Sequence, residues 1–314
     1  PVEGWEILTA SELKTMLREL APPDQWAAFE RSRDADFAYG LSGVARFRVN
    51  YFWQHRGMGA VRRIIPEEIR SLEELNWPQV VHELTHLTHG LVLVTGPTGS
   101  GKSTTLAAII DAINENYDKH VVTIEDPIEF VHPPKRCLVS QREVGQHTQS
   151  FAAALRAAIR QNPDVILVGE MRDFETIALA IRAAEMGTLV LGTLHTNSAI
   201  KTVDRIIDAF PEDMQEQARL SLSQSLAAVV AQLLMPKVGG GRVACHEILM
   251  RTQALPNIIR EGNTAMLASV IQNGRAHGMQ TMDDTLASLV QQGLIHADDA
   301  YRKAQDKARF EKLM

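Results

Sequence analysis

The sequence predicts an α/β protein in which a small α+β domain precedes a larger domain built on a parallel sheet. After Pro78, short runs of valine, isoleucine and leucine alternate with alanine-rich helical stretches, which is typical of a sheet covered on both faces. A glycine-rich motif at residues 96–103 joins one such strand to one such helix. Before Pro78, residues 45–52 alternate between apolar and polar side chains, as a half-buried strand does.

The composition is that of an ordinary folded protein. Of the 314 residues, 45% are hydrophobic and 22% are charged, which excludes a collagen-like or wholly disordered chain. A net charge of −6 provides no global basic field, so we expect no nucleic-acid partner. The two cysteines are too few for a disulfide framework, and a reducing cytoplasm is the expected location. No apolar run approaches the ~20 residues that span a bilayer, so we expect no direct membrane insertion.

The small domain is expected to occupy residues 1–65. Leucines and a methionine at helical spacing predict a helix over residues 11–20, which two prolines end. The strand over residues 45–52 is expected to continue through a turn at Gly57-Met58-Gly59 into a second strand. Residues 66–79, with an acidic, helix-like stretch, form the expected linker.

The larger domain is expected to occupy residues 80–314. Its strands are predicted at residues 91–95, 121–125, 165–169 and 189–193. Its helices are predicted at residues 103–116, 151–160, 174–186 and 213–234. Gly239-Gly240-Gly241 predicts a turn before one more strand, and the pattern of the last ~65 residues is helical.

The strongest chemical signal is the match of residues 96–103 to G-x-x-x-x-G-K-[ST], the Walker A phosphate loop. Glycines let the backbone approach phosphate oxygens, and the N-terminus of the following helix favours anions. Lys102 is expected to reach the β- and γ-phosphates of ATP, and the Ser103 hydroxyl to bind Mg²⁺. The predicted nucleotide-binding residues are Gly96, Pro97, Thr98, Gly99, Ser100, Gly101, Lys102, Ser103 and Thr104.

Acidic residues follow two of the predicted strands. Glu125, Asp126 and Glu129 lie at and after the end of the strand over residues 121–125, where α/β proteins bind ligands. One of these carboxylates is expected to polarise an attacking water, the alternative being a solvated acidic turn. Glu170 ends the next apolar run in the Walker B pattern, and a carboxylate there holds Mg²⁺ through water or orients the nucleophile.

A histidine follows another apolar strand. His195 is predicted to sense the γ-phosphate, the alternative being a structural histidine.

The segment from His82 to His86 matches the zinc-protease motif H-E-x-x-H, and His89 adds a third imidazole. On one helix these histidines would share a face. The strand at residues 91–95 follows at once, however, and leaves room for only a short helix. We therefore predict a polar connector and no functional zinc.

Several separate boxes, in this order, resemble the type IV pilus retraction ATPases, the twitching-motility branch of the type II/IV secretion ATPase family. The resemblance covers nearly the whole chain. One box, at residues 254–261, resembles a C-terminal motif associated with retraction. The other boxes lie at residues 44–50, 90–105, 123–131, 168–173, 192–199 and 278–281.

The resemblance implies a RecA-like P-loop motor domain preceded by a PAS-like domain, which is expected to be truncated because its first strands would lie before Pro1. It implies that Glu129 is the catalytic glutamate and that Glu170 is the Walker B glutamate. His195 matches the family's histidine box, although Thr188 stands where an earlier histidine is usual.

The resemblance also implies that Arg48 and Arg63 reach the nucleotide. Two antiparallel strands could place these arginines side by side on one face, because they are fifteen residues apart around the predicted turn. Exposed strand arginines with solvated or salt-bridged side chains are the alternative.

As function, the resemblance implies a homohexamer that binds ATP and Mg²⁺ and couples ATP hydrolysis to pilus retraction. Its implied partners are an inner-membrane pilus platform protein and a paralogous retraction ATPase, at the cytoplasmic face of the inner membrane. A pilus-extension or type II secretion ATPase is an alternative, which the lack of a tetracysteine zinc module disfavours. A nucleotide-binding accessory subunit of the retraction machinery is another.

Overall fold

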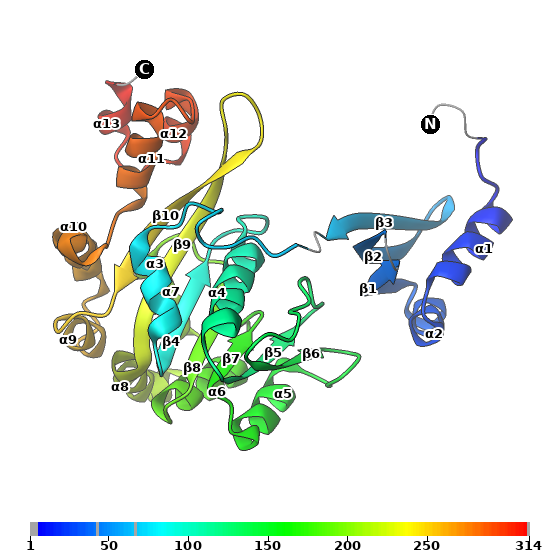
Figure 1. Cartoon of the computed structure of the whole chain (residues 1–314), viewed down its shortest axis with the longest axis horizontal. Helices are drawn as coiled ribbons and strands as arrows, with labels where there is room; N and C mark the ends of the chain where they lie inside the picture. Colours follow the sequence, from blue (N-terminus) through cyan, green and yellow to red (C-terminus); the bar gives the residue numbers. More distant parts are fainter. Residues whose placement is uncertain (1–5, 42–43, 66–67, 313–314) are drawn as a thin grey trace. The chain divides into compact units, whose positions relative to one another are not determined.

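A computed structural model describes residues 6–41, 44–65 and 68–312 and divides into two compact units (Figure 1). The smaller unit comprises Pro1–Ile69 and Pro127–Val131, and the larger unit comprises Arg70–Asp126 and His132–Met314. Pro66 and Glu67, where the expected linker begins, lie outside the described residues.

In the smaller unit, two helices precede an antiparallel sheet in the order β1-β2-β3. Phe29, Phe37 and Tyr51 form its aromatic core, with ring centroids 5.2 to 5.6 Å apart. The Tyr51 hydroxyl donates to the Leu17 carbonyl at 2.9 Å and so joins sheet to helix. The elements are α1 (Ala10–Leu20), α2 (Pro23–Ser32), β1 (Asp34–Leu41), β2 (Ala45–Gln54) and β3 (Gly57–Ile65).

The hairpin turn of this sheet lies at His55 and Arg56, so the turn predicted at Gly57-Met58-Gly59 is wrong by two residues. β3 already begins at Gly57, which pairs with Gln54. Gly59 pairs with Phe52, and an added Cβ at Gly59 would lie 2.6 Å from that ring. Gly59 therefore makes room for an aromatic side chain and does not form the turn.

The larger unit confirms the predicted α/β class with a parallel sheet. Its described strands run in the order β10-β9-β4-β8-β7-β5-β6, and only the pairing of β9 with β10 is antiparallel. The strands are β4 (Gly90–Thr95), β5 (His120–Glu125), β6 (Leu138–Glu143), β7 (Val165–Val168), β8 (Leu189–Leu194), β9 (Leu226–Pro236) and β10 (Arg242–Met250).

Helices cover both faces of this sheet (Figure 1). Along β4, Leu91 and Leu93 pack against one helical layer, whereas Val92 and Val94 pack against the other. The helices are α3 (Gln79–Glu83), α4 (Lys102–Asn116), α5 (Phe151–Ala158), α6 (Phe174–Glu185), α7 (Ala199–Asp208), α8 (Gln215–Ser225), α9 (Leu255–Arg260), α10 (Leu267–Asn273), α11 (Met282–Gln291), α12 (Ala297–Lys303) and α13 (Lys307–Glu311). None of the helices in the described ranges combines the length and apolar character that crossing a membrane requires.

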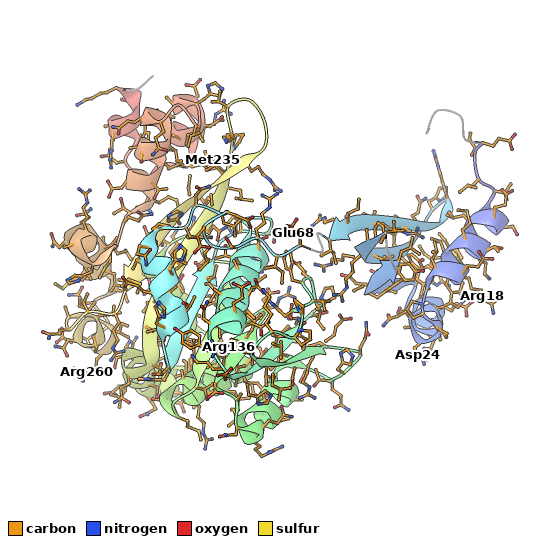
Figure 2. All side chains as sticks on the ribbon, viewed as in Figure 1. Arg18, Asp24, Glu68, Arg136, Met235 and Arg260 are labelled. Atoms are coloured by element: carbon orange, nitrogen blue, oxygen red, sulfur yellow. The ribbon has the colours of Figure 1, made fainter. Side chains whose placement is uncertain are left out.

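A separate apolar cluster packs the C-terminal helices onto the β9–β10 ribbon. Met235, which Figure 2 labels, and Cys245 belong to it together with Leu286 and Phe310. These four residues are at most 2% exposed. The predicted helical C-terminus is thus confirmed, and its helices have a core of their own.

The helix predicted over residues 213–234 is wrong in its second half. α8 ends at Ser225, and the chain continues as β9, paired on both sides with β4 and β10. The run from Leu226 to Ala231 consists of leucine, alanine and valine, which are compatible with either structure. The two neighbouring strands decide the outcome, because they satisfy its backbone hydrogen bonds inside the core.

The helix-like stretch expected in the linker is also wrong. Ser71 and Glu74 exchange the hydrogen bonds of a helix start, at 2.8 and 3.2 Å. The turn nevertheless ends at Asn76, whose φ of 55° is left-handed. Leu72 and Trp77 are anchored in the core of the larger unit, which stops the helix after one turn.

The buried His246 predicts a loss of stability in acid. Its ring packs against Trp77 in a tilted arrangement, with centroids 4.7 Å apart, and burial lowers its pKa from 6.5 to about 4. Between these two pH values the unfolded chain binds more protons than the folded chain, so stability falls as the pH falls. The contribution is intact above pH 6.5 and declines by about 1.4 kcal/mol per pH unit towards pH 4.

Urea unfolding across this range should show a shallower pH dependence in His246→Phe than in the wild type. His132, whose pKa burial also lowers to about 4, accounts for part of the dependence that remains. An unchanged slope in the variant would contradict burial of a neutral His246.

Candidate nucleotide-binding site

The phosphate loop lies between β4 and α4, at the carboxyl edge of the parallel sheet. Gly96, Gly99 and Gly101 have φ values of 146°, 79° and 91°, which side chains other than glycine rarely adopt. An added Cβ at Gly96 would lie 2.2 Å from the Gln232 carbonyl oxygen, and one at Gly101 would lie 2.8 Å from Gln232 Nε2. The loop conformation therefore requires glycine at both ends.

Lys102 lies across this loop. Its Nζ donates to the Gly96 and Pro97 carbonyl oxygens at 2.9 and 3.1 Å. The Ser100 hydroxyl oxygen is buried and has no hydrogen-bond partner within the described part of the chain. An ammonium held over glycine backbone at the first residue of a helix fits a phosphate group.

Glu170 and His195 come together, which the sequence did not predict. They follow β7 and β8, adjacent parallel strands, and His195 Nε2 lies 2.7 Å from Glu170 Oε1. Arg172 pairs with the same oxygen. Burial raises the pKa of Glu170, but the hydrogen bond and charge of Arg172, with a smaller effect of His195, outweigh it, so the pKa is lowered. The Glu170 side chain is therefore ionised at the carboxyl edge of the sheet.

The acidic residues after β5 separate into two environments. Glu125 accepts hydrogen bonds from the Thr123 hydroxyl at 2.6 Å and from Gln141 Nε2 at 3.2 Å. Glu129 lies in the segment Pro127–Val131, which belongs to the smaller unit by its contacts. Glu125 is thus engaged by its neighbours at the sheet edge, whereas Glu129 is grouped with the smaller unit.

Arg48 and Arg63 lie directly opposite each other on β2 and β3, which confirms the placement predicted from their spacing. Arg48 Nη2 lies 2.8 Å from Asp36 Oδ2, and its Nη1 lies 4.0 Å from Glu129 Oε1. Arg63 is exposed. Arg48 and Arg63 therefore share one face of the sheet in the smaller unit, and Arg48 lies near Glu129. Their role in catalysis stays a prediction.

The three connector histidines are engaged elsewhere. α3 ends at Glu83, and a short 3₁₀ helix, Leu84–His86, follows it, so the motif lies on no continuous helix. His82 Nδ1 lies 3.3 Å from Glu73, His86 contacts the Tyr117 hydroxyl, and His89 contacts Thr88. Across the described ranges, no three histidine, cysteine or acidic side chains are grouped as metal ligands.

The donors at the sheet edge suit a hard cation. Ser103 is exposed at the start of α4, Glu125 ends β5, and Glu170 lies two residues after the end of β7. Hydroxyl and carboxylate oxygens are the ligands that Mg²⁺ prefers, together with substrate phosphates and water. The residues present therefore fit the ion that a phosphate loop uses.

A cavity of about 1050 Å³ adjoins the end of the phosphate loop. Its lining includes Gly101 and Thr104 of the loop and of α4, together with Trp77 and His246. Small-molecule sites have volumes of roughly 300–1,000 Å³, so this cavity is large enough for the base and sugar of a nucleotide.

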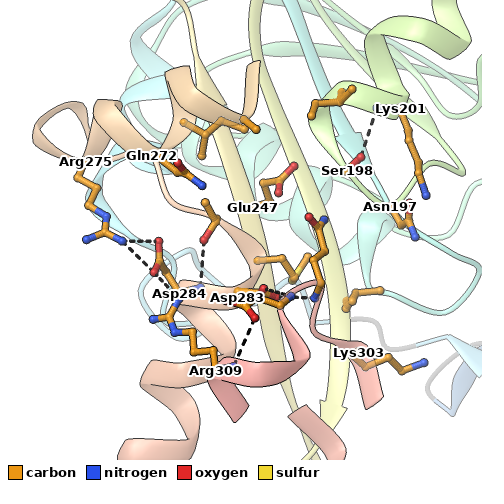
Figure 3. Close-up of a pocket in the computed structure, with 18 residues that line it drawn as sticks. Asn197, Ser198, Lys201, Glu247, Gln272, Arg275, Asp283, Asp284, Lys303 and Arg309 are labelled. Carbon is orange, nitrogen blue, oxygen red and sulfur yellow. Dashed lines mark hydrogen bonds and ion pairs between the residues drawn. The ribbon is translucent and has the colours of Figure 1, made fainter. Parts of the chain in front are cut away.

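A second cavity, of about 810 Å³, lies where α7 and β10 meet the C-terminal helices (Figure 3). Glu247 of β10 is buried there, and its Oε1 accepts from the Ala199 backbone N–H at 2.8 Å. Burial raises the pKa of this carboxyl. Ala199 begins α7, shortly after His195, so Glu247 fixes the start of the helix that follows the histidine loop.

Gln232 of β9 is the contact that the sequence analysis missed. It is 3% exposed and bonds both the phosphate loop and α4. A signal was present, because a single polar residue interrupts the apolar run from Leu226 to Met235. Because leucine, alanine and valine also fit a helix, the local pattern predicts a helix there, and a helix would not bring this glutamine beside the loop.

Comparison of the sequence with known proteins also points to a nucleotide-binding protein. The model of the type II/IV secretion system protein family matches residues 39–313. The type IV pilus retraction ATPase PilT of Pseudomonas aeruginosa is 51% identical over 303 residues, which are 96% of this chain and 88% of that protein. A twitching motility protein of Neisseria gonorrhoeae is 54% identical over 95% of this chain and 80% of its own length.

The fold comparison leads to the same family. A crystal structure of the pilus retraction motor PilT with bound ADP superimposes with a TM-score of 0.88 at 47% identity, over 95% of this chain and 85% of that one. The family model, the close relatives and the shared fold all extend over most of the sequence. This chain therefore belongs to the type II/IV secretion system protein family.

Proposed function

We propose that this chain is a motor that uses Mg²⁺-dependent ATP hydrolysis to retract type IV pili. The chain is an ATPase, as the phosphate loop and the activity named for its relatives indicate. The observation that carries the retraction proposal is the similarity to proteins named for pilus retraction and twitching, at 51–54% identity over 95–96% of this chain. The alternative functions, pilus extension and secretion, predict different effects on surface pili and twitching when the motor is inactivated in cells.

The proposed mechanism assigns a task to each residue of the site. Lys102 exchanges the Gly96 and Pro97 carbonyls for the β- and γ-phosphates, while the loop amides hold phosphate oxygens. Glu129 orients and deprotonates the attacking water. The Glu170–His195 pair lies at the strand ends and responds to loss of the γ-phosphate. Ser103 and Glu170 would hold Mg²⁺, which supplies positive charge to the phosphates when bound.

The assembly proposed is a homohexamer, with residues 1–65 as a PAS-like domain, 66–79 as the linker and 80–314 as the RecA-like motor. Its proposed partners are an inner-membrane platform protein, through which the motor acts on pilin, and a paralogous retraction ATPase. Its proposed location is the cytoplasmic face of the inner membrane. Hexamer formation can be measured by light scattering with and without ATP.

A cellular experiment tests the retraction proposal. In the source organism, the gene is replaced by the Lys102→Ala form, and surface pili and twitching are measured. We expect pili to be present, or more abundant, and twitching to be lost. Loss of the pili themselves would assign the chain to extension. Unchanged pili and unchanged twitching would contradict a role in pilus function.

Arg48→Ala and Arg63→Ala should each lower ATP turnover by about 10² or more while weakening nucleotide binding far less. The permanent charge and planar fork of arginine suit the charge that develops on phosphate oxygens in the transition state. Arg62→Ala is the matched control, because Arg62 lies on the same strand but points to the opposite face.

Mixing either arginine variant with Lys102→Ala protein tests donation by a neighbouring subunit. Partial recovery of activity is expected if the arginine acts across an interface between subunits. Turnover at the wild-type rate in both single variants would refute a role for these arginines.

A further inference from the structure

We propose that Gln232 is a positioning residue that holds the phosphate loop in its nucleotide-binding conformation. The inference rests on nucleotide binding by this loop, which is part of the proposed function, and does not depend on pilus retraction. Gln232 lies on β9, outside every motif that the sequence indicates as a nucleotide site. It is nevertheless adjacent to the loop, because β9 pairs with β4, with Ala231 opposite Thr95.

The side-chain amide of Gln232 joins the loop to the helix that follows it. Its Nε2 donates to the Ser100 carbonyl oxygen at 2.7 Å. Its Oε1 accepts from the Thr105 hydroxyl at 2.9 Å, in the first turn of α4. Thr105 is 1% exposed and Gln232 is 3% exposed, so water does not compete for these hydrogen bonds.

The backbone of Gln232 supports the other end of the loop. The Gln232 carbonyl oxygen is so close to Gly96 that a Cβ added there would lie 2.2 Å from it. A Cβ added at Gly101 would likewise lie only 2.8 Å from Gln232 Nε2. One residue of β9 thus contacts the loop at its first glycine and at its last.

Only a carboxamide satisfies both side-chain contacts. The Ser100 carbonyl requires a donor, and the Thr105 hydroxyl donates to an acceptor. Glutamate would keep the acceptor for Thr105 but would place an oxygen against the Ser100 carbonyl. Leucine would remove the donor to the buried Ser100 carbonyl and leave the Thr105 hydroxyl only the Gly101 carbonyl, 3.2 Å away, as an acceptor. A buried carbonyl without its donor commonly displaces a loop. A displaced loop would lose the glycine backbone conformation that lets phosphate oxygens approach.

The test is ADP affinity, measured by isothermal titration calorimetry on the full chain. Gln232→Leu and Gln232→Glu should each weaken ADP binding by about tenfold or more, because small displacements of a pre-organised site have large effects. Gln217→Leu is the matched control, since Gln217 is an exposed glutamine of α8, and we expect wild-type affinity for it.

A double-mutant cycle separates positioning from general structural damage. Thr105→Val removes the donor to Gln232 Oε1, so the effects of Thr105→Val and Gln232→Leu on ADP affinity should be less than additive. The positioning role also predicts that thermal unfolding without nucleotide changes little compared with the loss of affinity.

Three outcomes would overturn the proposal. The first is wild-type ADP affinity in the folded Gln232 variants. The second is strict additivity with Thr105→Val. The third is a large drop in unfolding temperature while the folded fraction still binds ADP normally. If wild-type protein itself fails to bind ADP, the proposed function fails, and that result is distinct from all three.

Discussion

Replacing Lys102 by alanine should lower the rate of ATP hydrolysis by about 10² to 10⁴-fold while leaving the fold intact. Lys102 Nζ lies 2.9 Å from the Gly96 carbonyl, so its charge is already held at the mouth of the loop. Loss of such a charge removes stabilisation of the negative charge that accumulates during phosphoryl transfer. Steady-state phosphate release measures the rate, and thermal unfolding measures the fold.

Lys14→Ala is the matched control, because Lys14 is an exposed lysine on α1, in the smaller unit. Its ATPase rate should equal that of the wild type. Near-normal hydrolysis by purified Lys102→Ala protein would disprove the assignment of residues 96–103 as the nucleotide site.

Glu129→Gln should retain ATP binding but lose turnover by about 10² to 10⁴-fold. Glu129 is outside the phosphate loop, so the loop that binds the phosphates is unchanged. Glutamine has the shape of glutamate but cannot take a proton from water, so the chemical step is affected while affinity is preserved. Binding of a fluorescent ATP analogue and single-turnover hydrolysis measure the two quantities separately.

Glu125→Gln provides the comparison within the same acidic segment. Glu125 already accepts hydrogen bonds from Thr123 and Gln141, so a smaller effect on turnover is expected. The opposite ranking, with Glu125→Gln inactive and Glu129→Gln active, would transfer the role of general base to Glu125.

The parallel sheet could be predicted because its central strands are buried on both faces. In β4, every residue from Gly90 to Thr95 is buried, so the sequence shows a continuous apolar run and no alternation. The phosphate loop could also be predicted, since glycine readily adopts the positive φ values of Gly96, Gly99 and Gly101 and leaves room for a phosphate at the backbone. Burial on both faces and a glycine backbone are local requirements, so they can be recognised from residues that are adjacent in the sequence.

Other features could not be predicted because they depend on residues that are distant in the sequence. The region from Leu226 is a strand because β4 and β10 lie on either side of it. Pairing with these two strands outweighs the local propensity of its residues. Glu170 and His195 meet because their strands are neighbours, although 25 residues separate them. Arg48 and Arg63 were placed correctly only because both belong to one hairpin.

Residues close together in the chain were therefore enough to predict the α/β class, the phosphate loop and the strand ends that present Glu170 and His195. Three contacts emerged only in the folded chain: Gln232 supports the loop, Glu170 pairs with His195, and Glu129 belongs with the smaller unit. The two groups of features differ in the range of the interactions that produce them. A glycine loop and a long apolar run are visible in adjacent residues. The conformation of an ambiguous run such as Leu226–Ala231 and the pairing of buried polar groups depend on which strands become adjacent.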